Sequence, residues 1–192
     1  MELILVRHAQ PLAEETSDGR PADPELSEAG VDQARAVANW LAKQSVDRIV
    51  SSPAKRAQRT ANLSATRLGL AVSVDERLCD ANPDDTRYVP LEDDRERDPE
   101  AYRARLLAYQ ASPAWTSVSR RVNDAIDEWV AGHPGRRLVV FCHGSVVNVF
   151  AARVLGLRER VFLDADYASA SRFTISRHGV RSVKSLNETG YL

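Results

Sequence analysis

Leu3-Ile4-Leu5-Val6-Arg7-His8-Ala9-Gln10, close to the start of the sequence, is the stretch on which the interpretation of the fold depends. Its four aliphatic residues form a short apolar run, which predicts a buried β-strand. The run ends abruptly in Arg7 and His8. Because ligands of open parallel sheets bind just beyond the carboxyl ends of the strands, we expect these two side chains at a ligand site.

The same pattern occurs a second time, far away in the chain. Leu138-Val139-Val140-Phe141-Cys142 is another apolar run, and it leads into His143-Gly144-Ser145. A second buried strand would therefore deliver a second histidine to the edge of the sheet. Two strand-end histidines, together with arginines, predict a pocket for an anion.

Helix and strand patterns alternate in the first part of the sequence. After the first strand we expect a helix from Ser27, its cap, to about Lys43, then a strand over Asp47–Val50. A helix with Ser52 as its cap, Pro53 at its first position and Gly69 as its stop should follow, and then a strand over Ala71–Val74. This β-α-β-α-β order predicts a mostly parallel sheet covered by helices.

The second part of the sequence begins with an irregular, highly charged segment and then becomes regular again. The stretch Glu92–Asp98 is most simply a solvated loop, and Ala9–Leu26 is a second long loop without periodicity. The regular elements that we expect here are helices over Asp98–Gln110, Ser117–Gly132 and Ser145–Leu155, the strand Leu138–Cys142, and a hairpin of Arg172–Ser176 with Val180–Leu186. We expect one domain over residues 1–192, with an insert or lid over about residues 80–117.

The composition is that of a globular protein and excludes several functions. The chain has 192 residues, of which 43% are hydrophobic, and a net charge of −1, so no basic field points to nucleic acid or to an anionic membrane surface. Two cysteines, Cys79 and Cys142, are too few for a disulfide framework, and the spacing of the four histidines predicts no metal site. The first apolar run is too short for a signal peptide or a membrane span, which favours the cytoplasm.

A third cationic element lies between the two histidines. Arg56 follows Ser51-Ser52-Pro53 and falls in the first turn of the expected helix. A helix N-terminus presents free N–H groups and the positive end of the helix dipole, and an arginine adds a planar fork of donors that fits phosphate oxygens. Taken alone, Arg56 would be an ordinary solvent-facing charge; together with the histidines it predicts a phosphate pocket.

These motifs together resemble the histidine phosphatase superfamily, the phosphoglycerate-mutase-like proteins. The matching motifs are Arg7-His8-Ala9, Leu26-Ser27-Glu28-Ala29-Gly30 with Gln33-Ala34, Ser51-Ser52-Pro53 with Arg56-Ala57 and Thr60-Ala61, Cys142-His143-Gly144, and Leu186-Asn187-Glu188-Thr189 with Tyr191-Leu192. They occur in the family's order and cover nearly the whole chain except roughly residues 82–117. The resemblance implies a three-layer α/β/α fold with an antiparallel edge strand and a helical insert over the active site.

The resemblance also implies roles for the strand-end residues. His8 would attack phosphorus and become a phosphohistidine, while Arg7, Arg56 and His143 would hold the phosphoryl oxygens. The chemistry is consistent, because phosphoryl transfer depends mainly on positioning and charge neutralisation, and an unprotonated imidazole is a competent nucleophile. No cofactor is expected, and hydrolysis in two steps removes the need for a metal.

The general acid is the point at which this sequence departs from the family. The family usually has Glu two residues after a Leu in this region, and here Leu78-Cys79-Asp80 places Asp80 there. Asp is one methylene shorter, and its pKa would have to be raised for it to protonate a leaving group near neutral pH. Asp80 is the expected acid; Asp84 or Asp85 could substitute if the loop curls differently.

Three further residues were considered for the site. Gln10 would either line the pocket and contact substrate or make a loop hydrogen bond. Cys142 next to His143 could suggest a thiol nucleophile, but neighbours on a strand point to opposite faces. Ser145 lacks the flanking glycines of a nucleophile elbow and is expected to cap the following helix.

The sequence therefore predicts a phosphomonoester hydrolase acting on a small phosphorylated metabolite through phospho-His8. A protein phosphohistidine phosphatase and a catalytically weak phospho-ligand binding module are the alternatives. A phosphoglycerate mutase is disfavoured, because the family's mutases carry Glu-Arg-His-Tyr where this chain has Asp80-Ala81-Asn82-Pro83. Neither the physiological substrate nor the oligomeric state follows from the sequence.

Overall fold

The apolar run at the start of the chain forms the centre of the molecule. In the computed structural model, which describes residues 1–90, 95, 97–112, 114–158 and 161–192, β1 spans Glu2–Arg7. Leu3, Ile4, Leu5 and Val6 are fully buried. Because successive side chains of a strand point to opposite faces, Leu3 and Leu5 enter one hydrophobic core and Ile4 and Val6 enter the other.

The main sheet has six strands in the order β4-β3-β6-β1-β7-β8. Their bounds are Val72–Val74, Arg48–Ser51, Arg137–Cys142, Glu2–Arg7, Ala170–Ile175 and Arg181–Glu188. Strands β4, β3, β6 and β1 are parallel, whereas β7 and β8 form the antiparallel edge. The expected α/β architecture with a mostly parallel sheet, an antiparallel edge and a terminal hairpin is confirmed.

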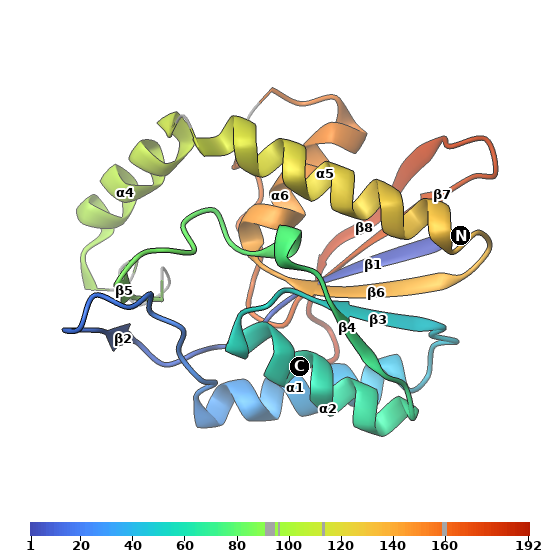
Figure 1. Ribbon diagram of the computed structural model, residues 1–192, viewed down its shortest axis with the longest axis horizontal. Helices are drawn as coiled ribbons and strands as arrows, with labels where there is room; N and C mark the ends of the chain where they lie inside the picture. The colour runs from blue at the N-terminus through green and yellow to red at the C-terminus, as the bar shows by residue number, and fades with distance from the viewer. Residues whose placement is uncertain (91–94, 96, 113, 159–160) are drawn as a thin grey trace.

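Helices cover both faces of this sheet (Figure 1). Helices α1 (Glu28–Leu41) and α2 (Lys55–Leu68) lie on one face, and α5 (Ala114–Gly132) and α6 (Gly144–Leu155) lie on the other. The first pair buries alanines and aliphatic residues against Ile4 and Val6, and the second pair buries larger residues, including Phe150, against Leu3 and Leu5. None of the described helices is both long and apolar enough to span a membrane.

The ends of the helices agree with the sequence at some positions and differ at others. Ser27 caps α1 by accepting the N–H of Gly30, and Gly69 and Gly156 end α2 and α6 in the left-handed conformation. The prediction that Ser52 caps α2 was wrong, because this helix begins at Lys55 with Ala54 at the cap position. The prediction that Ser145 caps α6 was also wrong, because that helix begins at Gly144 with His143 at the cap position. Both serine hydroxyls instead bond side chains of the candidate site, described below.

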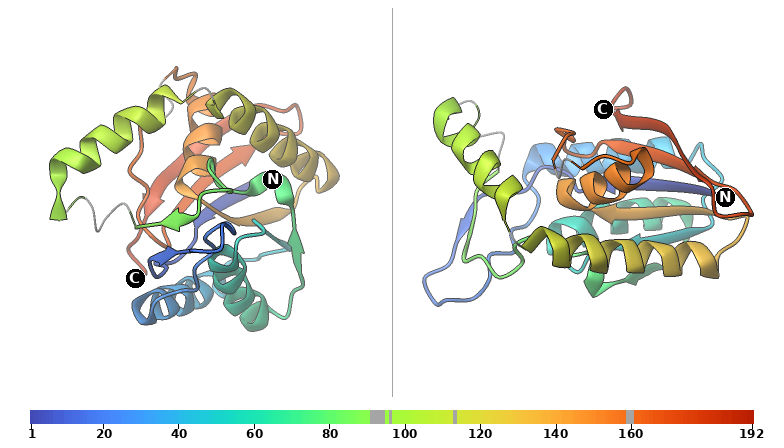
Figure 2. Two further views of the ribbon diagram at one scale, coloured as in Figure 1. Left: turned by 60° about the vertical axis from the view of Figure 1, so that its left-hand side comes forward. Right: turned by 90° about the horizontal axis from the view of Figure 1, so that it is seen from above.

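The segment between β4 and α5 crosses the carboxyl edge of the sheet. It contains the short helix η1 (Glu76–Leu78), strand β5 (Arg87–Tyr88) and helix α4 (Pro99–Ala111), which begins at its cap Asp98 as expected. Residues 91–94 and 96 of the expected charged loop lie outside the described residues. Helix α4 buries none of its described residues and stands away from the body of the molecule (Figure 2).

A two-stranded ribbon joins this segment to the loop after β1. Strand β2 (Glu14–Glu15) pairs antiparallel with β5, so that Glu14 lies opposite Tyr88. The backbone hydrogen bonds from Thr16 to Thr86 and from Ala22 to Asp85 extend the contact. The ribbon was not expected from the sequence, where Ala9–Leu26 is a loop. The single domain with an insert over about residues 80–117 stays a prediction.

Candidate active site

The strand ends bring the two histidines together as expected. Strands β1 and β6 are parallel neighbours with Arg7 opposite Cys142, so the residues that follow each strand lie at the same edge. The rings of His8 and His143 are 5.1 Å apart between centroids and both are buried. Arg56 lies in the first turn of α2, directly after β3, the other neighbour of β6.

Arg56 joins these groups through one edge of its guanidinium. Its Nε lies 3.3 Å from Nε2 of His8, and its Nη2 lies 3.4 Å from Nδ1 of His143. The Arg56 side chain is only 6% exposed. A buried guanidinium between two imidazoles is a strong site for an anion, because its donors are fixed in the fork geometry that matches phosphate oxygens.

The hydrogen bonds of His8 determine which of its nitrogens can react. Nδ1 lies 2.9 Å from the carbonyl oxygen of Ala9, which can only accept, so the proton is assigned to Nδ1. Nε2 is then unprotonated, and its lone pair accepts the Nε–H of Arg56. Burial, and then the charges of Arg56, His143 and Arg7, hold the pKa of His8 well below its usual value of 6.5. His8 is therefore neutral at physiological pH.

Arg7 is held by the chain segment that precedes β7. Its Nη1 donates to the carbonyl oxygen of Ala165, and its guanidinium carbon lies 3.8 Å from the centre of the Tyr167 ring. The side chain is buried beside His8, and its position adds a second cation to the site. The cation–π contact and the carbonyl bond restrict the guanidinium to one orientation.

His143 is oriented by the serine that was expected to cap α2. The Oγ of Ser52 lies 2.7 Å from Nε2 of His143 and also accepts the N–H of Ala54. Burial lowers the pKa of His143 to about 3, with the carboxylate of Asp80 opposing the shift and Arg56 reinforcing it. In the ligand-free site His143 is therefore a neutral side chain.

Asp80 completes the cluster from the loop after η1. Its Oδ1 accepts hydrogen bonds from the hydroxyl of Ser145, at 2.7 Å, and from the N–H of Ala81, at 2.8 Å. Its Oδ2 lies 3.5 Å from Nη2 of Arg56 and 3.6 Å from Nδ1 of His143. This engagement explains why Ser145 does not cap α6.

The pKa of Asp80 is lowered in this structure, not raised. Burial by itself would raise the pKa, but His143, Arg56 and the hydrogen bonds from Ser145 and Ala81 outweigh it and hold the pKa below its usual value. Arg121 of α5 fixes the backbone here by donating to the carbonyl oxygens of Arg77, Cys79 and Asp80. Asp80 is thus a carboxylate in this arrangement.

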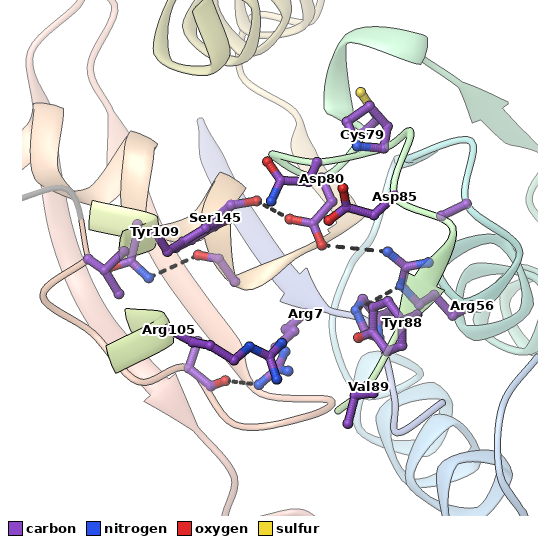
Figure 3. A pocket seen from close by; sticks show the side chains of 18 of the residues that line it. Arg7, Arg56, Cys79, Asp80, Asp85, Tyr88, Val89, Arg105, Tyr109 and Ser145 are labelled. Atoms are coloured by element: carbon purple, nitrogen blue, oxygen red, sulfur yellow. Dashed lines mark hydrogen bonds and ion pairs between the residues drawn. The ribbon is translucent and has the colours of Figure 1, made fainter. Parts of the chain in front are cut away.

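The cluster lies at the base of a cavity of about 800 Å³ (Figure 3). Its wall comes from the β2–β5 ribbon, from α4 and from the segment before β7; the side chains that line it include Arg87, Tyr88, Tyr102, Arg105, Leu106, Tyr109, Asn148 and Phe162. The volume is in the range of small-molecule sites. Apolar and charged side chains are mixed around the cavity: Tyr88 stacks on Arg56 at the base, and Arg87 and Arg105 lie in the wall together with Leu106.

The structure does not bring every candidate residue to the site. Gln10 is not among the residues that line the cavity; its side-chain oxygen lies 3.4 Å from the Ser27 hydroxyl, as in a loop hydrogen bond. Asp85 lines the cavity, whereas Asp84 is exposed outside it. The thiol residue Cys142 is buried in the core beneath α5 and α6, on the other side of the strand from the histidine pair.

Sequence reasoning missed residues that hold the catalytic candidates in place. Ser52 and Ser145 follow predicted strands at the same sheet edge, so their positions contained a signal that was interpreted as helix capping. Tyr167 and Arg121 had no local signal, because each contacts a segment far away in the sequence. Such contacts depend on how α5 and the chain before β7 pack, which no short pattern encodes.

The arrangement as a whole suits a phosphoryl group. Arg7, Arg56 and the His8 imidazole line a space at the end of the parallel strands, and the His143 imidazole lies behind them against Arg56. The unprotonated Nε2 of His8 accepts a hydrogen bond from Arg56 at this space. A carboxyl group that can exchange partners lies beside them. This combination provides charge neutralisation, a nucleophile and a proton-transfer group.

Comparison with known proteins agrees with this geometry. The chain is 32% identical to Bifunctional protein Rv2228c of Mycobacterium tuberculosis, over 99% of this chain and 54% of that protein. The chain therefore spans about half the length of this relative. It is 30% identical to Phosphoserine phosphatase 1 of Hydrogenobacter thermophilus, over 95% of this chain and 90% of that protein.

A solved structure is also similar along the whole chain. A mycobacterial glucosyl-3-phosphoglycerate phosphatase in complex with VO3 superposes with a TM-score of 0.76 at 27% identity, covering 98% of this chain and 99% of that one. Residues 3–189 match the family described as histidine phosphatase superfamily, branch 1. With a match over nearly its entire length, the chain belongs to the histidine phosphatase superfamily.

Proposed function

We propose that this protein is a metal-independent phosphomonoester hydrolase that works through a phosphohistidine on His8. The observation that carries the proposal is the neutral His8, whose unprotonated Nε2 accepts a hydrogen bond from Arg56 at 3.3 Å inside a buried cationic site. A phosphoryl group bound to Arg56 would take this donor and release the lone pair for attack. A phosphoryl group placed there would have its oxygens among Arg7, Arg56 and His143. These residues would stabilise the charge on the equatorial oxygens of the transition state.

In the first step, the lone pair of Nε2 forms a bond to phosphorus and the bond from phosphorus to the ester oxygen breaks. The departing alkoxide needs a proton, which Asp80 would supply. The incoming phosphoryl dianion raises the pKa of Asp80, since it places like charge nearby and competes for Arg56 and His143. Substrate binding would thus favour uptake of a proton from solvent by the carboxylate, and this is the proton that Asp80 then gives to the alkoxide.

In the second step, water attacks the phosphorus and the bond to Nε2 breaks. Asp80, now ionised again, would take a proton from this water, and inorganic phosphate would leave. His8 returns to its neutral form with the proton still on Nδ1, where the Ala9 carbonyl holds it. Dividing hydrolysis into two displacements gives each step a positioned nucleophile.

Hydrolysis of a small molecule fits the site better than the alternatives. The relatives are named as phosphatases of phosphoserine and of glucosyl-3-phosphoglycerate, both phosphorylated small molecules. The nucleophile lies at the base of a cavity walled by the ribbon and α4, which favours a small ligand over a phosphohistidine on a protein surface. The placement of Asp80 within reach of the phosphoryl site favours turnover over simple binding.

The first experiment is phosphate release from an aryl phosphate, with and without EDTA. We expect activity in the wild type that survives EDTA and is lost in His8→Ala by a factor of about 10³ or more, since removing a covalent nucleophile forfeits most of the catalysis. Protein quenched at alkaline pH should carry a base-stable phosphate on His8 that is lost on treatment with acid. Activity that persists in His8→Ala, or that needs added metal, would contradict the proposal.

A further inference from the structure

Arg56 uses only one edge of its guanidinium for the catalytic groups. Nε and Nη2 face His8, His143 and Asp80, as described above. The remaining nitrogen, Nη1, points the other way and lies 3.5 Å from Oδ1 of Asp23. Asp23 comes from the loop after β1, 33 residues before Arg56 in sequence numbering, and its side chain is two-thirds buried.

The carboxylate of Asp23 also defines where α2 begins. The same Oδ1 accepts the N–H of Lys55, the first residue of the helix, at 2.9 Å. Ala54, at the cap position, has no side chain that can do this. One carboxylate oxygen therefore satisfies the helix terminus and neutralises part of the charge of the arginine one residue later.

Asp23 is in turn held by the ribbon. Its N–H donates to Oε2 of Glu14, at 2.8 Å, and Glu14 pairs with Tyr88 across the two strands. The ring of Tyr88 covers the face of the Arg56 guanidinium, with 4.5 Å between the guanidinium carbon and the ring centre. The ribbon therefore contacts Arg56 in two ways. Glu14 of β2 holds Asp23, which contacts Nη1, and the Tyr88 ring of β5 stacks on the guanidinium. Figure 3 shows the Tyr88 ring beside Arg56.

We propose that Asp23 is a positioning residue for phosphoryl binding. It holds Nη1 of Arg56, so that the edge formed by Nε and Nη2 faces the phosphorus. This inference rests on the proposed function, because it assigns Arg56 to the phosphoryl group. Bidentate binding of phosphate needs two parallel N–H groups in one orientation. Asp23 fixes that orientation without occupying either of those two donors.

The carboxylates of Asp80 and Asp23 contact different nitrogens of Arg56 and therefore have different roles. Asp80 contacts the edge that the phosphoryl group would use, so a ligand competes with it. Asp23 contacts Nη1, outside the edge formed by Nε and Nη2, so a phosphoryl group bound at that edge would not displace it. Without Asp23, the guanidinium could turn towards Asp80 and present its donors poorly, so that both binding and turnover would decline.

The test is a double-mutant cycle on the binding of orthovanadate, measured by calorimetry. Asp23→Asn and Asp23→Ser both keep an acceptor for the Lys55 N–H and remove the charge. We expect each to weaken vanadate binding about tenfold, a coupling typical of charged neighbours, and to have almost no effect when Arg56 is already Ala. Arg56→Met serves as a second background, and Asp18→Asn, an exposed carboxylate of the same loop, is the matched control.

The outcomes separate the inference from the proposed function. If Arg56→Ala or Arg56→Met leaves vanadate affinity unchanged, the assigned phosphoryl site is wrong. If those variants bind weakly but the Asp23 variants bind as the wild type does, only the role of Asp23 is wrong. If the Asp23 substitutions weaken vanadate binding by the same factor whether or not Arg56 is present, Asp23 acts through the stability of the fold. The inference is then overturned.

Discussion

At the scale of single residues, the reactivity of the site depends on the protonation of His8. Burial and the neighbouring arginines hold its pKa well below 6.5, and the Ala9 carbonyl holds the proton on Nδ1. A base with a lowered pKa stays unprotonated as the pH falls. We therefore expect His8 to remain a neutral Nδ1–H imidazole at pH values below 6.5, at which an ordinary histidine becomes charged.

Imidazole ¹⁵N NMR measures both the charge and the tautomer, with His8→Ala identifying the signals. The lowered pKa also has a consequence for stability. Because the unfolded chain binds a proton at His8 more readily, the folded state should lose stability as the pH falls below about 6.5, and His8→Ala should reduce that loss. A His8 signal that titrates near its usual value would contradict the assignment.

Asp80 gives a second prediction at this scale, because a general acid matters most for a poor leaving group. Asp80→Asn keeps the hydrogen-bond acceptor for Ser145 and Ala81 but cannot deliver the proton. We expect kcat on an alkyl phosphate to fall by a factor of about 10² to 10⁴, and kcat on 4-nitrophenyl phosphate to fall much less.

Asp85→Asn is the matched control, since Asp85 also lines the cavity but was only an alternative acid. Any change in kcat of Asp85→Asn should be the same on the alkyl phosphate and on 4-nitrophenyl phosphate. If Asp80→Asn lowers kcat by the same small factor on both esters, Asp80 is not the general acid. If Asp85→Asn instead lowers kcat more on the alkyl phosphate, Asp85 is the general acid.

At the scale of secondary structure elements, the sequence could predict those with a long enough pattern. The buried runs of β1 and β6 and the amphipathic helices α1, α2, α5 and α6 each contain several periodic residues. Strands β2 and β5 have two residues each, which is too short for any alternation to be recognised. The cap of α2 could not be predicted either, because Asp23 reaches Lys55 across 32 positions of sequence.

Gly30 provides a test of how α1 docks on the loop after β1. A Cβ at this position would lie 2.0 Å from the carbonyl oxygen of Gln10, which also accepts the N–H of Ser27. Gly30→Ala must therefore push the loop away from the helix. We expect it to lower the free energy of unfolding by about 1–3 kcal/mol, as overpacking does, and to reduce activity because His8 lies two residues before Gln10.

Gly132→Ala is the control for this change. Gly132 is also helical and has no atom within 4 Å of its Cβ position. Alanine is better than glycine in a helix by up to about 1 kcal/mol, so this variant should be neutral or slightly more stable. Chemical denaturation measures the free energy of unfolding of both variants. If the two values are equal, the loop moves away from the added methyl group without loss of stability.

At the scale of the whole molecule, the cavity is made by segments that lie far apart in the sequence. The strand ends provide its base, while the ribbon, α4 and the segment before β7 provide its walls. The base could be predicted, since the strand-end residues Arg7, His8 and His143 and the helix-start residue Arg56 follow from the β-α-β pattern. The walls could not, because their position depends on tertiary packing of irregular segments, and so the shape of the leaving-group site was inaccessible from the sequence.

The walls lead to a last prediction, about the size of the substrate. A phosphate group fills only part of a cavity of about 800 Å³, and α4 contributes the apolar side chain of Leu106 to its wall. If the alcohol of the substrate lies against Leu106, truncating that side chain should weaken binding of a bulky ester. Removing a buried Leu contact is worth about 1.5–3 kcal/mol at most, so we expect Leu106→Ala to raise KM for 1-naphthyl phosphate by about 5- to 20-fold.

The adjacent leucine makes the comparison specific. Leu107 is 58% exposed and does not line the cavity, so Leu107→Ala removes the same atoms from the same helix without touching the substrate. We expect it to behave as the wild type on every ester, and we expect both variants to hydrolyse glycerol phosphate as the wild type does. If Leu106→Ala raised KM for the small and the bulky ester alike, α4 would act on the phosphoryl site rather than on the leaving group. If both leucine variants matched the wild type, the alcohol would bind elsewhere in the cavity, and the ribbon residues opposite α4 would be the next to vary.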